Sequence, residues 1–328
     1  MKVFITGATG LLGSFICRHL LQNGHEIKAV KRASSKMTLL EDITEQIDWV
    51  VGDMNDTVFL EESLAGVDGV IHAAAIISFD KRWEDKMYQT NVLGTADIVN
   101  ASLKCGVKKF LHISSVAAVG RKVGQEFLDE NNRWEAGEFD SIYARSKYYQ
   151  ELEVWRGGQE GLEVKIVNPS IVLGPGIWGA GGSTSVFKYA YDEKAFHPEG
   201  TVNYVDVRDV SEIVVKLLTS DIQDERFILN AGTVSYKDFF GTIAKAFGKK
   251  PPSKLVKPWM LKVAVAAEFI RSRITGNEAM ITKDTAILSR ANFHFKNDKI
   301  KEALNFEFKP LTESVDWSVQ ALKEKDKL

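Results

Sequence analysis

Apolar runs of strand length alternate with helical patterns through the first half of the chain, and this alternation restricts the fold more than any other feature. The runs are KVFITG, EIKAV, IDWVVGD, GVIHAAA, KKFLHISS and EVKIVNPS. Amphipathic stretches separate them, for example at 11–23, 57–64 and 91–104. Parallel strands need crossover connections, and helices supply them. The pattern therefore predicts an α/β fold with a doubly wound parallel sheet and helices on both faces.

Three glycines mark the first turn from strand to helix. Gly7, Gly10 and Gly13 stand where KVFIT ends and the first helical pattern begins. Unpaired backbone N–H groups and the helix dipole make such a turn a site for anions. The first glycine permits the turn, the second lets a pyrophosphate approach the backbone, and the third lets the helix pack on the strand. This G-x-x-G-x-x-G spacing is one residue longer in its first gap than the usual fingerprint, but its position predicts a Rossmann domain that binds a dinucleotide.

The end of the second strand indicates which dinucleotide is bound. The segment IKAVKRASSK offers Arg32 and no nearby acid, which favours the 2′-phosphate of NADP, with NAD as the alternative. A solvated basic loop is the plainer interpretation. Asp53 follows the third strand, where it could accept from the adenine amino group or cap a helix. The small side chains at 73–75 leave room for a cofactor, although tight packing would also explain them.

The alternating pattern changes after about Gly174, where GPGIWGAGGSTS has the character of a loop. NYVDVRDVSEIVVKLL then predicts a strand and a helix that return to the sheet, and the chain from about Thr233 is rich in helical patterns. A smaller, discontinuous C-terminal lobe is therefore expected beside the sheet. The predicted units are a Rossmann domain at 1–173, rejoined by 201–230, and a substrate-binding lobe at 174–200 and 231–328.

Composition narrows the class of protein and of partner. The 328 residues carry a formal net charge of −2, which argues against nucleic acid as the main partner. Cys17 and Cys105 are too few for a disulfide framework, and the six histidines lack ligand spacing, so we expect no metal site. No run reaches the length of a transmembrane helix. We expect a cytoplasmic protein whose partner is a small molecule.

A tyrosine and a lysine four residues apart carry the strongest sign of chemistry. In YARSK, Tyr143 and Lys147 share one face of a predicted helix. A neighbouring ammonium lowers the pKa of a phenol, so that proton exchange with a substrate oxygen becomes feasible. Such a pair alone can arise by chance. FLHISSVAAVG, however, places Ser114 and Ser115 at the carboxyl edge of the sheet, where ligands bind in open α/β folds and a hydroxyl can stabilise a developing alkoxide.

These motifs, in this order, resemble the extended short-chain dehydrogenases/reductases. TGATGLLG is similar to the cofactor motif of that family, and YARSK to its Tyr-x-x-x-Lys motif. ISS, NVLGT and NPSIVLGPG correspond to the segments after the middle strands. YVDVRDV and FKPLTESVDWSV are more loosely similar to members related to dihydroflavonol reductase and 3β-hydroxysteroid dehydrogenase.

The resemblance implies roles for individual residues. Tyr143 would be the catalytic acid, and Lys147 would lower its pKa and bind the nicotinamide ribose. Ser115 would polarise the carbonyl, and it is preferred to Ser114 because the serine of the family stands five positions before a glycine, here Gly120. Asn91 would support a water relay to the lysine, with a helix-stabilising role as the alternative.

The predicted cofactor contacts come from the residues and from the resemblance together. The resemblance places Pro169 and Val172 along the nicotinamide and Ser183 at the phosphates. The full set is Gly7, Thr9, Gly10, Leu11, Leu12, Gly13, Arg32, Asp53, Met54, Ala73, Ala74, Ala75, Ser114, Tyr143, Lys147, Pro169, Val172 and Ser183.

The favoured function is an NADP-dependent reductase that turns a ketone or aldehyde into an alcohol. The expected pocket walls, at 77–83, 117–138 and 177–191, include several aromatic residues and suggest an apolar or aromatic substrate. A nucleotide-sugar epimerase or dehydratase with a recycled cofactor is the first alternative, and Arg32 and the VAAV after Ser115 count against it. A redox sensor that binds NADP is the second, and the retained tyrosine, lysine and serine count against that.

Two features of possible interfaces stay open. PWMLKVAVAAEFI, at 258–270, is apolar around much of a helix. We predict that this helix packs in the core, and a helix facing lipid or a second subunit is the alternative. A homodimer through 91–104 and 141–156 is an alternative to a monomer.

Overall fold

The centre of the molecule is a parallel sheet of seven strands in the order β11-β7-β5-β4-β1-β2-β3. The computed structural model describes residues 1–179 and 181–326, apart from the side chains of Ser183 and Asp326. The strands of the sheet are β1 (Lys2–Thr6), β2 (Glu26–Lys31), β3 (Asp48–Val51), β4 (Gly69–His72), β5 (Lys109–Ile113), β7 (Glu163–Pro169) and β11 (Glu225–Leu229).

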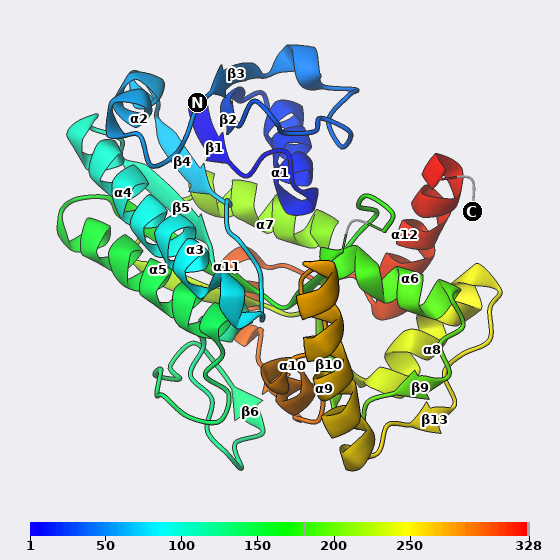
Figure 1. Cartoon of the computed structure of the whole chain (residues 1–328). Coiled ribbons are helices and arrows are strands. Elements are labelled where there is room, and N and C mark those ends of the chain that lie inside the picture. Colours follow the sequence, from blue (N-terminus) through cyan, green and yellow to red (C-terminus); the bar gives the residue numbers. More distant parts are fainter. Residues whose placement is uncertain (180, 327–328) are drawn as a thin grey trace.

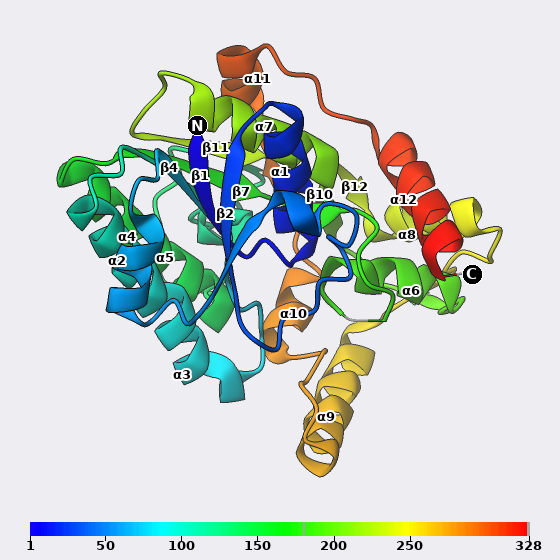
Figure 2. The same ribbon diagram turned by 90° about the horizontal axis from the view of Figure 1, so that it is seen from above.

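Helices cover both faces of this sheet (Figures 1 and 2). On one face, α1 (Leu11–Gln22) and α7 (Val207–Thr219) bury an apolar core that includes Ile5, Ile16 and Val214. On the other face lie α2 (Thr57–Leu64), α4 (Gly94–Lys104) and α5 (Ile142–Gln159), which bury a second core. The expected α/β fold is confirmed, because each apolar run of the first half forms a strand of one parallel sheet.

A second, smaller sheet organises the C-terminal lobe. β10 (Thr201–Asp206) pairs in parallel with β8 (Ile171–Leu173) and antiparallel with β12 (Gly232–Ser235). Three helices pack around it in a core of their own, namely α6 (Ser185–Tyr191), α8 (Tyr236–Phe247) and α12 (Leu311–Asp326). Of the segment expected to rejoin the Rossmann domain, α7 and β11 lie in the large domain, while β10 lies in the small sheet.

Short elements complete the chain. A π-helical turn (Tyr88–Leu93) joins α3 (Glu84–Met87) to α4. Two strand pairs tie distant segments together, β6 (Phe127–Leu128) with β14 (His294–Phe295) and β9 (Phe196–His197) with β13 (Lys254–Leu255). The remaining helices are α9 (Pro258–Thr275), α10 (Lys283–Leu288) and α11 (Asp298–Leu304).

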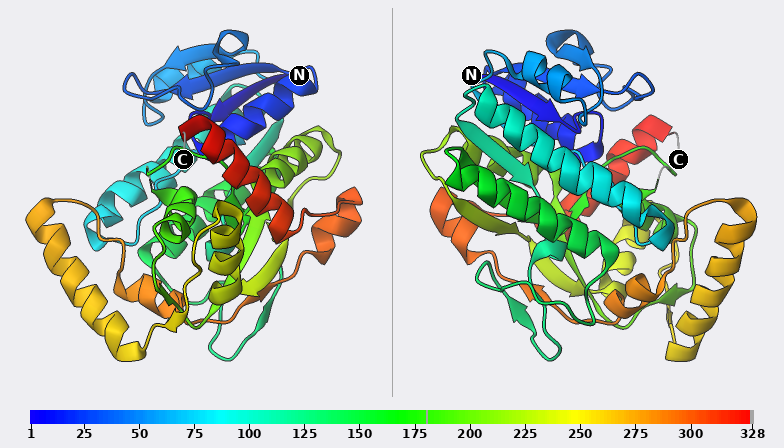
Figure 3. Two further views of the ribbon diagram at one scale, coloured as in Figure 1. Left: turned by 90° about the vertical axis from the view of Figure 1, so that its right-hand side faces the viewer. Right: turned by 60° about the vertical axis from the view of Figure 1, so that its left-hand side comes forward.

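The predicted core packing of the helix at 258–270 is wrong. α9 projects from the body of the molecule (Figures 2 and 3), and Ser272 is its one buried residue. Trp259 and Val263 are 62% and 59% exposed. An apolar pattern around a helix shows that the helix can be covered, but not that a neighbouring element covers it. Within the described part of the chain, no helix is both long enough and apolar enough to cross a membrane.

Candidate active site

The turn after β1 shows the expected backbone turn at Gly7 and the expected close packing at Gly13. Gly7 has φ +73°, and a Cβ there would lie 2.8 Å from the backbone of Ala73. A Cβ on Gly13 would lie 2.1 Å from the carbonyl oxygen of Gly7, so the third glycine is needed for the helix to pack. Gly10 is different, because its Cβ would meet nothing closer than 3.4 Å. Open space therefore lies in front of Gly10, at the N-terminus of α1, as a pyrophosphate would require.

Thr6, which the sequence analysis did not single out, holds the alanine segment. Its hydroxyl accepts hydrogen bonds of 3.1 Å from the backbone N–H groups of both Ala73 and Ala74. It also bonds the ring of the buried His72 at 2.8 Å. Burial, and then the charge of Lys147, lower the pKa of His72 to about 3, so this histidine is neutral and structural. An apolar run that ends in a threonine is the signal that could have indicated it.

Arg32 lies just after β2 with an exposed side chain. Its turn is closed by its backbone N–H, which donates to the Ser35 hydroxyl at 3.1 Å. The Lys31 side chain instead contacts Trp49, with its ammonium 5.3 Å from the centre of that ring. After β3, the cap of α2 is Asp56 rather than Asp53, because Asp56 accepts from Phe59 N–H at 3.1 Å. This corrects the capping alternative given for Asp53, whose adenine contact stays a prediction.

Ser115, Tyr143 and Lys147 come together at the end of β5. The Ser115 side chain lies close enough to the Tyr143 hydroxyl to lower its pKa, and Lys147 donates to the carbonyl oxygen of Ile113 at 2.9 Å. Ser141 caps α5 by accepting from Ala144 N–H at 3.1 Å, which fixes Tyr143 in the first turn. Both side chains of the Tyr-x-x-x-Lys motif are buried.

Burial controls the protonation of this cluster. It raises the pKa of Tyr143, and the neighbouring Ser115 side chain opposes that shift. It lowers the pKa of Lys147 to about 7, and the carboxylate of Glu151 opposes that shift. An ammonium with a pKa near neutrality supplies only part of a positive charge, so the lowering of the Tyr143 pKa by Lys147 stays a prediction for the complex with cofactor.

Glu151 is the main residue that the sequence analysis missed. It is fully buried and lies one turn beyond Lys147 on α5. Its Oε1 accepts from the Ser114 hydroxyl at 2.5 Å and from the Asn168 amide at 2.6 Å, and its Oε2 pairs with Arg226 at 3.1 Å. The Asn168 amide also donates to the carbonyl oxygen of Ser115 at 2.9 Å. The spacing of 143, 147 and 151 on one helix face was the available signal.

Asn91 lies in the π-helical turn and holds two segments together. Its amide donates to the carbonyl oxygen of Ile76 at 2.9 Å and to the Ser146 hydroxyl at 3.1 Å, and its Oδ1 accepts from Ile76 N–H at 2.7 Å. These bonds fit the stabilising alternative. The water relay stays a prediction.

The remaining predicted contacts lie near the end of β7. Pro169 ends that strand beside Leu229, and Val172 is half-buried on β8. The Ser183 side chain is outside the described residues. The described part of the chain contains no group of three or more His, Cys, Asp or Glu side chains placed to hold a metal ion.

The aromatic wall candidates separate into two groups. The ring of Phe79 lies 5.7 Å from that of Tyr143, inside a small apolar cluster with Met87 and Ile142. Trp178 and Phe187 instead belong to the core of the C-terminal lobe, where Trp178 packs 5.3 Å from Tyr191. Phe79 is therefore the aromatic residue that adjoins the tyrosine.

Comparisons with known proteins agree with this fold. The model of the NAD dependent epimerase/dehydratase family matches residues 3–232. The chain is 30% identical over 311 residues to "Putative dihydroflavonol 4-reductase" of Synechocystis sp., covering 92% of this chain and 88% of that one. It is 23% identical to cinnamoyl-CoA reductase 1 of Petunia hybrida, covering 99% and 93%. The crystal structure of gox2253 superposes with a TM-score of 0.83 at 30% identity, covering 99% and 98% of the two chains.

Proposed function

The chain belongs to the NAD-dependent epimerase/dehydratase family, and from this membership we propose that it is an NADP-dependent reductase of a ketone or aldehyde. The observation that carries the proposal is the buried cluster in which Ser115 adjoins the Tyr143 hydroxyl and Lys147 lies one helical turn away. A phenol held beside a second hydroxyl, with an amine of nearly neutral pKa, is suited to protonating a carbonyl oxygen.

Each member of the cluster has one task in this proposal. The nicotinamide cofactor, when bound, supplies the hydride. Ser115 donates a hydrogen bond to the substrate oxygen, and Tyr143 transfers its proton to that oxygen as the C=O bond becomes C–O–H. Lys147, whose pKa is about 7, can bind and release a proton near neutral pH and thereby restore the tyrosine. Glu151 holds Ser114 and, with Asn168, positions the segment that carries Ser115.

The turn after β1 supports the cofactor assignment. A Cβ would fill the space in front of Gly10, whereas the absence of one leaves the N–H groups of the turn open to a pyrophosphate. Arg32 is exposed at the end of β2, where a 2′-phosphate would lie, and we assign NADP rather than NAD on that basis.

The surroundings of Tyr143 support an apolar or aromatic substrate. The apolar side chains of Phe79, Met87 and Ile142 lie around the tyrosine. The names of two relatives, a cinnamoyl-CoA reductase and a dihydroflavonol reductase, refer to aromatic carbonyl compounds and point the same way. The cluster therefore favours reduction of an aromatic ketone or aldehyde over chemistry on a polar sugar.

The test is consumption of NADPH, and separately of NADH, against a panel of aromatic and aliphatic ketones and aldehydes. We expect substrate-dependent loss of NADPH absorbance that falls by about 10² to 10⁴-fold in Tyr143→Phe, with NADPH binding retained. Tyr149→Phe on the same helix is the matched control, because that side chain is 38% exposed, and it should keep full activity.

The outcome also decides between the alternatives. The family model includes epimerases and dehydratases, which recycle their cofactor. Tight cofactor binding without net consumption across the panel would overturn the reductase assignment in favour of such an enzyme, or of a redox sensor if no sugar nucleotide is converted either.

A further inference from the structure

The exposed side of α9 carries a continuous apolar stripe. Trp259, Val263, Ala266, Ile270 and Ile274 are spaced at i, i+4, i+7, i+11 and i+15, so they lie along one face of the helix. The four larger side chains are exposed to 62% (Trp259), 59% (Val263), 57% (Ile270) and 80% (Ile274). At a rise of about 1.5 Å per residue, the stripe extends over more than ~20 Å. Scattered exposed apolar residues are ordinary, but an aligned row of this length marks a contact surface.

The charges of the same helix are sorted by face. Lys262 and Arg273 are exposed beside the stripe, and the Arg273 guanidinium lies 5.1 Å over the ring of Phe269. Glu268 is the one carboxylate of α9, all of which the structure describes, and it is turned away and bonded to Arg271 at 2.7 Å. The outward surface is therefore apolar and basic.

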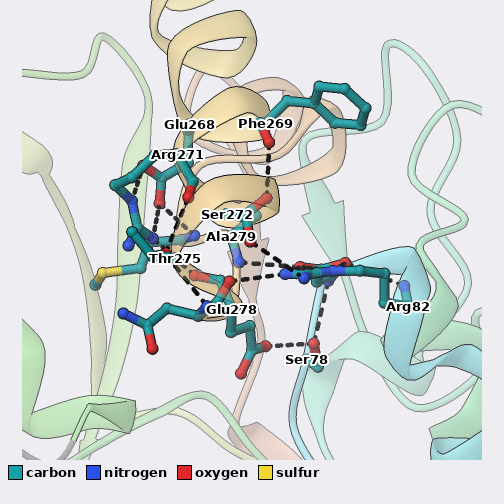
Figure 4. Close-up of polar contacts among 12 residues, drawn as sticks. Ser78, Arg82, Glu268, Phe269, Arg271, Ser272, Thr275, Glu278 and Ala279 are labelled. Carbon is teal, nitrogen blue, oxygen red and sulfur yellow. Dashed lines mark hydrogen bonds and ion pairs between the residues drawn. The ribbon is translucent and has the colours of Figure 1, made fainter.

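A polar latch fixes the direction in which this surface points (Figure 4). We use the term for the contacts of Ser78, Asp80 and Arg82 with the end of α9 and the residues that follow it. Arg82 donates to the carbonyl oxygens of Ser272 at 3.3 Å and Asn277 at 2.7 Å.

Three further interactions complete the latch. Asp80 accepts from Ala279 N–H at 3.0 Å and pairs with Arg82 at 2.6 Å, and the Ser78 hydroxyl donates to Glu278. The latch residues flank Phe79, which lies against Tyr143. The helix is thus held at its C-terminal end, beside the candidate active site, with its apolar stripe facing outward.

We propose that α9 docks the protein onto an anionic lipid surface. A helix with aromatic and aliphatic side chains on one face and lysine or arginine at its border lies in the plane of a membrane interface, where apolar burial and attraction to lipid phosphates act together. Here Trp259 and Ile270 would enter the acyl boundary, and Lys262 and Arg273 would contact the phosphates. The proposal is independent of the reaction assigned above.

The positive charges beside the stripe favour a lipid surface over a second copy of the chain as its partner. A symmetric dimer through the stripe would bring the Lys262 and Arg273 side chains of both copies together, because such an interface uses the same patch twice. The carboxylate of Glu268 lies on the other side of the helix, bonded to Arg271, and would not neutralise them. Anionic lipid headgroups would neutralise both side chains.

The experiment is vesicle flotation of the full chain. One set of vesicles is pure phosphatidylcholine, and the other contains about 30% phosphatidylglycerol. We expect the protein to float with the anionic vesicles at about 0.1 M salt and to be released at about 1 M salt. Flotation with neither set of vesicles at low salt would overturn the proposal.

A matched pair of substitutions assigns the binding to α9. Val263→Glu should weaken vesicle binding about tenfold or more, since it places a carboxylate in the stripe. Val58→Glu, on α2, changes a valine that is 64% exposed against 59% for Val263 and should bind as the native chain does. Circular dichroism confirms that both are folded.

The variants also expose the competing occupant. If sedimentation shows a dimer that Val263→Glu dissociates, while the native chain ignores anionic vesicles, then the stripe binds a second copy and the lipid proposal is wrong. Equal loss of flotation in Val263→Glu and Val58→Glu would likewise contradict it.

Discussion

At the scale of single residues, burial determines how the candidate site responds to pH. Lys147 is enclosed on α5, and its pKa falls from 10.5 to about 7. Between these values the unfolded chain holds a proton that the folded chain does not. The contribution of Lys147 to the stability of the fold therefore rises with pH across this window. The destabilisation caused by burying its charged form is fully present below pH 7.

Lys147→Met removes this dependence. The free energy of unfolding of the variant should exceed that of the native chain by most near pH 6. This difference should shrink by roughly 2 to 4 kcal/mol as the pH rises to about 10. Urea unfolding across pH measures this, with the exposed Lys245→Met as control. Glu151→Gln removes a charge that raises the Lys147 pKa, so the window should begin at a lower pH. Parallel stability curves for the native chain and Lys147→Met would contradict the argument.

At the scale of elements, the turn between β1 and α1 separates the needs of the fold from those of the ligand. A methyl group at position 13 collides with the Gly7 carbonyl oxygen at 2.1 Å, whereas one at position 10 meets the same oxygen only at 3.4 Å, an ordinary contact distance. Gly10 also has φ −82°, which any residue can adopt. Gly13 therefore serves packing, and Gly10 leaves the turn open for the cofactor that we propose.

Two alanine substitutions test this division. Gly13→Ala should lower the free energy of unfolding by about 1 to 3 kcal/mol, because overpacking displaces α1 from the strand. Gly10→Ala should keep the native melting temperature but weaken NADPH binding. Thermal melts and fluorescence titration distinguish the two. Normal NADPH binding by Gly10→Ala would show that the pyrophosphate does not bind at this turn.

The elements differ in how far the sequence reveals them. Alternating apolar runs identify the strands of the large sheet because a buried parallel strand is apolar over its whole length. The helix face shared by Tyr143 and Lys147 is equally local. Thr6 and Asn168 act on partners distant in sequence. Thr6 is indicated only by its place at the end of an apolar run, and no local pattern marks Asn168. The sequence showed the apolar pattern of α9. Whether another element would cover that helix depended on the whole fold.

At the scale of the whole molecule, the latch joins two segments that are far apart in the sequence. Asp80 and Ala279 are 199 positions apart, and Arg82 reaches the carbonyl oxygens of Ser272 and Asn277. Few apolar contacts hold α9, since Ser272 is its one buried residue. A segment held mainly by polar bonds opens at a lower free energy than the cores.

Arg82→Met should open the latch without unfolding the protein. Amide hydrogens at 272–280 should exchange faster, by about tenfold or more, while those of β4 and β5 keep their protection and the melting temperature changes little. Hydrogen–deuterium exchange read by mass spectrometry measures this. The exposed Arg290→Met is the control. Unchanged exchange at 272–280 in Arg82→Met would show that other contacts hold the helix.

The distance along the chain that the latch spans also has a meaning in time. Its partners meet only after nearly two hundred intervening residues have been made and placed, and closing so long a loop is entropically costly until both cores exist. During synthesis, residues 78–82 therefore emerge long before their partners do. The latch can therefore form only after residue 279 has been made, late in the synthesis of the chain.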